Sequence, residues 1–183
     1  GLQGLAEVRH CDYRDVLETG FDAVSSIGLT EHIGVRQYAD YFSTLHGKLR
    51  PGGRLLNHCI TRRDSATAPA AGAFIDRYVF PDGELAPVGT IVSAMHDNGF
   101  DVRHLENLRE HYALTLQGWC RNLDEHWDEA LGEVSLGTAK VWGLYMAGSR
   151  LAFERGEIGL HQVVGVKPDH DGDAHLPLRP TWS

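Results

Sequence analysis

A carboxylate and an imidazole follow two separate apolar stretches of this 183-residue chain. Glu31 comes just after the apolar run 21–25, and His58 lies in the apolar run 54–61. If the two runs are neighbouring parallel strands, their carboxyl ends meet at one edge, where open α/β sheets place their chemistry. The two side chains would then form the polar floor of a pocket. Taken singly, each also has an ordinary explanation: Glu31 as an acid at a helix N-terminus, and His58 as a hydrogen-bonded interior histidine.

The segments around these residues predict a βαβ unit. A strand over 21–28 is followed by a helix over 35–49. Apolar side chains recur along that helix at 3.6-residue spacing, namely Tyr38, Tyr41, Phe42, Leu45 and Leu49. The turn Pro51-Gly52-Gly53 ends the helix, and a second strand follows over 54–61. Elements in this order give two parallel strands with a right-handed crossover.

The rest of the chain predicts further elements of an α/β fold. They are a short strand over 5–10, helices over 87–98, 109–131 and 138–155, and strands over 100–108 and 158–166. We therefore expect a sheet of about five strands with flanking helices and an antiparallel edge among the late strands. One domain is expected over residues 1–168, followed by a loose polar tail over 169–183.

Two stretches leave alternatives open. The apolar and aromatic segment 74–81 suits either a lid over a ligand cavity or a satellite core cluster. Asp12 follows the strand expected over 5–10. It suits either a turn cap or a contact to a ligand's amino or hydroxyl group, and this stretch alone favours the cap.

Composition excludes several classes of protein. The net charge of −8 argues against a nucleic-acid-binding protein, which needs a basic face. Three cysteines without a CxxC pair suit a reducing compartment, and no apolar run approaches transmembrane length. Eleven histidines invite a metal hypothesis. None of their spacings is that of a metal site, so no metal is expected.

Six motifs occur in the order of one known family. They are Asp12-Tyr13-Arg14-Asp15, Ser26-Ile27-Gly28 with Glu31-His32, Leu49-Arg50-Pro51-Gly52-Gly53, Tyr78-Val79-Phe80-Pro81-Asp82-Gly83, Leu108-Arg109-Glu110-His111-Tyr112-Ala113 with Trp119, and Phe153-Glu154 with His161-Gln162-Val163-Val164. Through them the chain resembles the cyclopropane-fatty-acyl-phospholipid synthases and the mycolic acid cyclopropane synthases. Those enzymes are S-adenosylmethionine-dependent methyltransferases that act on lipid double bonds. A single motif would be a weak signal, whereas six collinear ones are strong.

The resemblance implies a partial class I, Rossmann-like methyltransferase sheet with its first strands missing. In the family, the glycine-rich loop and the acidic residue that takes the ribose lie upstream of residue 1. A fragment or truncated product with weak or no activity is therefore expected. The family's S-adenosylmethionine site implies that Asp12 and Tyr13 lie against the adenine. Ser149 replaces a cysteine of the family and is not assumed to be a nucleophile.

The resemblance also implies a bicarbonate ion held by Glu31, His58, Tyr112 and the backbone N–H of Ile60. Glu31 is expected to accept from the O–H of the ion, and the other three groups to donate to it. In the implied reaction the alkene attacks the sulfonium methyl, and the ion then removes a proton from the transferred methyl. Aromatic faces are candidates for stabilising the cation, namely Tyr13, Tyr78, Phe80 and Trp119.

The implied function is methyl transfer from S-adenosylmethionine to the double bond of unsaturated fatty acyl chains of phospholipids. The product is either a cyclopropane or a mid-chain methylene or methyl branch. We expect a cytoplasmic protein in peripheral contact with the inner face of the membrane, with a homodimer as one option. Two alternatives stay open: a methyltransferase acting on a non-lipid small molecule, and an inactive remnant that binds acyl chains.

Overall fold

The computed structural model describes residues 1, 4–65, 72–81 and 83–179. They contain a four-stranded sheet in the order β1-β2-β4-β3, formed by β1 (Phe21–Ile27), β2 (Leu49–Arg62), β3 (Asp101–Asn107) and β4 (Ile158–Val166). The helices are α1 (Thr30–Ile33), α2 (Tyr38–Lys48), α3 (Ala73–Tyr78), α4 (Val88–Asp97), α5 (Arg109–Glu125), α6 (Trp127–Glu133) and α7 (Leu136–Glu154). The predicted α/β class is confirmed.

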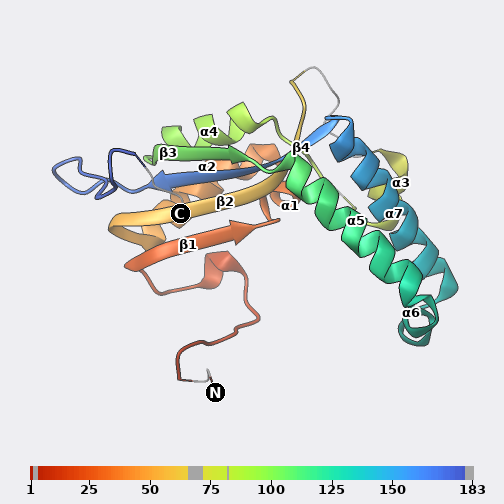
Figure 1. Ribbon diagram of the computed structural model, residues 1–183. Helices are drawn as coiled ribbons and strands as arrows, with labels where there is room; N and C mark the ends of the chain where they lie inside the picture. The colour runs from red at the N-terminus through yellow and green to blue at the C-terminus, as the bar shows by residue number, and fades with distance from the viewer. Residues whose placement is uncertain (2–3, 66–71, 82, 180–183) are drawn as a thin grey trace.

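The helices fall into two groups around the sheet (Figure 1). Helices α2 and α4 lie along the sheet, whereas α5, α6 and α7 form an arm that projects beyond its end. Within the arm α5 and α7 pack along each other, and both contact β4. In the part of the chain that the structure describes, no helix is both long and apolar enough to cross a membrane.

The main core lies between α2, α4 and one face of the sheet. Tyr38, Tyr41, Phe42 and Leu45 of α2 are all buried, as their helical spacing predicts. Strand β2 alternates along its second half, so every other side chain points into this core. The opposite face of β2 carries His58 toward the arm.

Strand register brings the predicted site residues to one edge. Strands β1 and β2 are parallel, with Ile27 opposite His58, and the Gly28 N–H donates to the His58 carbonyl at 2.9 Å. This confirms the predicted βαβ unit. Strand β4 then pairs antiparallel with β2 and places Gln162 opposite His58.

Three sequence predictions are wrong. Pro51-Gly52-Gly53 was expected to be a turn before the second strand and lies within β2. Residues 5–10 form no strand, and Leu5 and Val8 are 85% and 98% exposed. Alternating hydrophobicity makes a strand only where a neighbouring strand and a core exist to receive it. Among the described residues neither lies beside this segment. The helix expected over 109–131 is broken at His126, whose φ of −117° and ψ of 33° are not helical. The apolar residues keep a helical spacing across the break, so the pattern alone did not reveal two helices; they are Leu116, Trp119, Leu123 and Trp127.

Candidate active site

A cavity of about 320 Å³ lies between the ends of β1 and β2 and the arm helices α5 and α7. Glu31, His58, Ile60 and Tyr112, which the resemblance assigned to one site, all line it. Most of the remaining wall is apolar, including Ile27, Ile75, Phe80, Leu85 and Leu160. The four predicted residues are thus brought together rather than scattered. A mostly apolar cavity with a few convergent polar groups is the usual form of a small-molecule site.

Glu31 is the buried acid of this cavity, and only 7% of the residue is exposed. Its Oε1 accepts a hydrogen bond from the Ile60 N–H at 2.7 Å. Its Oε2 is buried and has no partner among the described residues. Burial raises the pKa of Glu31, although the bond from Ile60 acts in the opposite direction. Because an unpaired buried carboxylate oxygen is costly, a donor that enters the cavity would be bound well there.

The Ile60 N–H has a protein partner, which the sequence reasoning did not foresee. It was expected to donate to a bound ion, and in the structure it donates to Glu31. The bond ties the acid of α1 to the backbone of β2. It fixes one carboxylate oxygen, so the other is the oxygen left to face a ligand.

His58 presents a half-buried imidazole to the cavity. Its Nδ1 lies 3.0 Å from the side-chain nitrogen of Gln162 on β4. Burial lowers the pKa of His58, so the ring is neutral at and above pH 7. The sequence pattern identified His58 but not its contact to Gln162.

Tyr112 stands in the first turn of α5, with its ring held by two other aromatic side chains. The ring lies edge-on to Phe153 at 5.0 Å between centroids and to Trp119 at 5.9 Å. Burial raises the pKa of Tyr112. The hydroxyl therefore stays protonated at neutral pH and is a hydrogen-bond donor.

Helix α7 adds Tyr145, which the sequence reasoning missed, and Ser149, which it had noted only as the replacement of a family cysteine. Tyr145 and Ser149 lie one helical turn apart and both line the cavity. Burial raises the pKa of Tyr145, and a side-chain hydrogen bond with Ser149 acts in the opposite direction. Their spacing indicates a buried helix face, but it does not distinguish a core from a cavity wall.

Only one of the four aromatic candidates lines this cavity. Phe80 does so, 5.5 Å between centroids from Tyr145. Together with Ile75 it places segment 74–81 against the cavity, as the lid alternative predicted. Tyr78 and Trp119 are 55% and 46% exposed and are not among its walls.

Asp12 and Tyr13 line a second, larger hollow of about 700 Å³. The Asp12 carboxylate accepts from the Arg14 backbone N–H at 2.9 Å and from the Arg14 guanidinium at 2.7 Å. These bonds hold the pKa of Asp12 down at about 2 and cap the 3₁₀ turn Tyr13–Asp15. Asp12 is therefore a turn cap that also borders a hollow. His32 lines both hollows, so the two adjoin.

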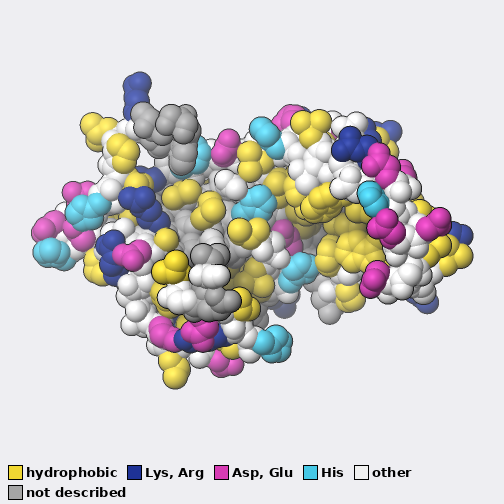
Figure 2. Space-filling model, turned by 60° about the horizontal axis from the view of Figure 1, so that its bottom comes forward, with side chains coloured by type: hydrophobic (Ala, Val, Ile, Leu, Met, Phe, Trp, Pro, Cys, Tyr) yellow, Lys and Arg dark blue, Asp and Glu magenta, His cyan; other side chains and the backbone are white. Residues whose placement is uncertain are grey.

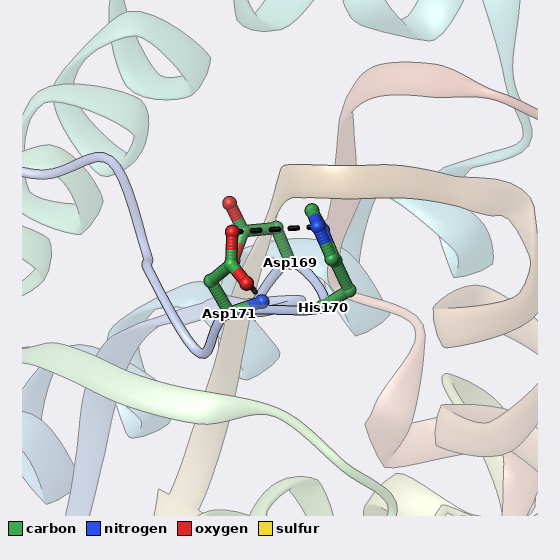
Figure 3. Close-up of side chains that lie close together, drawn as sticks. All are labelled: Asp169, His170 and Asp171. Atoms are coloured by element: carbon green, nitrogen blue, oxygen red, sulfur yellow. Dashed lines mark hydrogen bonds and ion pairs between the residues drawn. The ribbon is translucent and has the colours of Figure 1, made fainter.

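Three potential metal ligands lie together in the C-terminal segment, as Figure 3 shows for Asp169, His170 and Asp171. Asp169 already accepts the N–H groups of Asp171 and Asp173, each at 2.9 Å, and the His175 Nε2 at 2.8 Å. These bonds form an Asx-type turn, so we assign no metal to it. The expected domain boundary at residue 168 and the looseness of the tail beyond it stay predictions.

The fold is part of an S-adenosylmethionine methyltransferase fold. The chain superimposes on the cyclopropane synthase MmaA2 from Mycobacterium tuberculosis with a TM-score of 0.75 at 27% identity, covering 83% of this chain and 57% of that one. It matches mycolic acid cyclopropane synthase CmaA1, in complex with SAH and CTAB, with a TM-score of 0.74 at 26% identity and the same coverage.

The chain belongs to the family described as mycolic acid cyclopropane synthetase, whose family model matches residues 1–163. It is 63% identical over 182 residues to a probable fatty acid methyltransferase, Rv3720, of Mycobacterium tuberculosis. That match covers 100% of this chain but only 43% of the relative. The chain thus spans less than half the length of this relative.

Proposed function

We propose that this chain is the acyl-binding, acid-bearing part of an S-adenosylmethionine-dependent fatty acid methyltransferase. Its substrate would be the double bond of unsaturated acyl chains in phospholipids. The observation that carries the proposal is the buried, unpartnered Oε2 of Glu31 in a mostly apolar cavity that His58 and Tyr112 also line. The relative's own description, probable fatty acid methyltransferase, supports the same substrate class.

Residues of this chain suit the groups that the family implies. The hollow beside Asp12 and Tyr13 would take the adenine end of S-adenosylmethionine, whose sulfonium supplies an electrophilic methyl. It adjoins the Glu31 cavity through His32. Bicarbonate would supply a small base in that cavity. Its hydroxyl needs an acceptor and its oxygens need donors, and the unpartnered oxygen of Glu31 is an acceptor of that kind.

The protein groups then act by binding and orientation. Glu31 Oε2 would accept a hydrogen bond from the anion's hydroxyl, while its Oε1 stays fixed by the Ile60 N–H. The neutral ring of His58 and the protonated hydroxyl of Tyr112 are the donors available to the anion's oxygens. In a cavity that excludes water such preorganised contacts are strong. The faces of Phe80 and Tyr145 would stabilise positive charge on the substrate carbon.

The apolar lining suits an alkyl chain, and it favours neither a cyclopropane nor a branched product.

Peripheral membrane contact on the cytoplasmic side is part of the proposal. Exposed apolar side chains on the arm support it, since Leu114 and Leu144 are 66% and 61% exposed. Figure 2 shows hydrophobic side chains gathered on the side of the molecule where the arm lies. A homodimer through the same surface is the alternative use of these side chains.

The test is transfer of labelled methyl from S-adenosylmethionine to vesicles of a mono-unsaturated phospholipid, by the longest form of the protein that its gene encodes. Glu31→Gln is expected to lower the rate about 100-fold or more, as loss of a charge-stabilising group does. Glu129→Gln, at an exposed position of α6, is the matched control and should leave the rate unchanged. Turnover retained by Glu31→Gln would remove the assigned role. Methylation of amine or hydroxyl acceptors instead of lipid would favour the non-lipid alternative.

A further inference from the structure

Gln162 contacts His58 from the neighbouring strand. The two residues are opposite one another in the antiparallel pair β2–β4. The Gln162 side-chain nitrogen lies 3.0 Å from His58 Nδ1. An amide nitrogen donates hydrogen bonds and does not accept them, so in this contact Nδ1 is the acceptor.

A ring nitrogen that accepts a hydrogen bond carries no proton. In neutral imidazole the proton then resides on the other nitrogen, Nε2. Burial lowers the pKa of His58, which keeps the ring neutral at and above pH 7. Because Gln162 occupies Nδ1, Nε2 is the nitrogen left to the cavity that His58 lines.

We propose that Gln162 is a positioning residue that holds His58 in the Nε2–H tautomer, so that His58 is a hydrogen-bond donor and not a base toward the cavity. The other polar groups of the cavity agree with this. Glu31 offers an unpartnered acceptor from α1, and Tyr112 offers a hydroxyl from α5. An Nε2–H beside them adds a ring donor to the acceptor of Glu31 and the hydroxyl groups of the cavity. That set suits a small oxyanion that carries one hydroxyl.

The role of this tautomer in catalysis rests on the proposed function, but the tautomer itself does not. The tautomer can be determined by nitrogen NMR of the 183-residue chain with isotopically labelled histidine. Ring nitrogens that carry a proton and ring nitrogens that carry a lone pair have separate chemical shifts. The signals that disappear in His58→Gln belong to the His58 ring. At about pH 8, well above the ordinary histidine pKa of about 6.5, we expect a proton on Nε2 alone. A proton on Nδ1 would overturn the inference.

Gln162→Glu is the sharper variant because a carboxylate only accepts hydrogen bonds. It is expected to draw the His58 proton to Nδ1, whereas Gln117→Glu, at an exposed position of α5, should leave the tautomer unchanged. If a folded Gln162→Glu chain keeps Nε2–H, the inference is wrong. If that variant does not fold, Gln162→Met decides, since it cannot donate: a mixed tautomer supports the inference, and unaltered Nε2–H overturns it.

A rate measurement separates this inference from the proposed function. In the longest form of the protein, Gln162→Glu is expected to lower kcat for phospholipid methylation about 10–100-fold, by analogy with losing the partner that orients a metal-bound histidine. KM for the lipid should change little, because Gln162 is not among the cavity walls. If no form methylates lipid while the tautomer follows Gln162, the proposed function fails and the positioning contact stands.

Discussion

The Ile60 N–H and Glu31 Oε1 are joined by a 2.7 Å hydrogen bond that holds a buried carboxylate against strand β2. The second oxygen of that carboxylate has no partner among the described residues. One carboxylate oxygen is thus stabilised by a hydrogen bond, whereas the other is removed from water without gaining a partner. Such an unpaired group lowers stability and is kept where binding needs it. The protein should therefore become more stable when the charge is removed.

Glu31→Gln is expected to raise Tm at about pH 8 and to have little effect near pH 4. Burial holds the folded-state pKa of Glu31 above its unfolded value of about 4.3. Below that value both states are protonated, and the charge has no effect. As the pH rises, the unfolded state loses its proton first, so the wild-type chain loses stability that the variant keeps. Calorimetry across this range measures the difference, at about 2–4 °C per kcal/mol. A variant that is less stable at neutral pH would contradict this account.

Tyr112→Phe is expected to lower methylation about 100-fold while changing the free energy of unfolding by less than about 1 kcal/mol. The ring keeps its edge contacts with Phe153 and Trp119, and only the hydroxyl is lost. Rate measurements and urea unfolding on the same preparation separate the two effects. Tyr78→Phe, at a residue 55% exposed, is the control and should alter neither. An equal loss in both variants would point to a general perturbation.

Local patterns predicted the parts of the fold that depend on nearby residues. The helical spacing of Tyr38, Tyr41 and Phe42 identified the buried face of α2, because 3.6-residue periodicity is a property of the helix itself. The turn at Pro51-Gly52-Gly53 separated that helix from the next strand in the prediction. In the structure β2 begins at Leu49 rather than at residue 54, so Pro51-Gly52-Gly53 lies within the strand and the predicted turn is wrong. Motif order then indicated the family, and with it the four residues that meet in the cavity.

Contacts between distant residues were beyond the sequence pattern. The bond of Gln162 to His58 spans 104 positions and depends on the register of β2 against β4. Strand β4 is largely buried on both faces, so alternation does not reveal which of its side chains face the cavity. The hydrogen bond from the Ile60 N–H to Glu31 was not predicted, for a related reason. A backbone donor leaves no trace in residue type, and only coordinates show its partner.

The protein is expected to lose stability as the pH falls from about 7 to 5. Burial lowers the pKa values of His46, His58 and His161 below the ordinary value of about 6.5. Below that pH the unfolded chain binds protons that the folded chain excludes. His161→Gln should therefore flatten the fall in Tm, whereas His10→Gln, at an exposed position, should not.

Stability between pH 7 and 5 is best measured with Glu31→Gln present in every chain that is compared. The raised pKa of Glu31 has the opposite effect on stability over part of this range. Removing it leaves the half-buried His46, His58 and His161 as the histidines of the described residues whose pKa burial lowers. A stability profile that stays level from pH 7 to 5 in this background would show that these imidazoles are not desolvated in the folded protein.

Glu84 connects the part of the cavity wall that contains Gly83 and Leu85 to α1 and to the turn after it. Its carboxylate accepts from the Val35 N–H at 2.9 Å, and its own N–H donates to the Glu31 carbonyl at 2.9 Å. Glu84→Ala removes the first bond and keeps the second, so we expect a loss of about 1–2 kcal/mol in the free energy of unfolding. Hydrogen exchange of the Val35 amide should quicken more than exchange in α2, because the lost bond is local.

Two further variants serve as controls. Glu84→Gln retains an acceptor and should recover most of the protection, whereas Glu129→Ala at an exposed position of α6 should leave exchange at Val35 unchanged. Equal exchange at Val35 in Glu84→Ala and the wild-type chain would mean that this bond does not hold the wall.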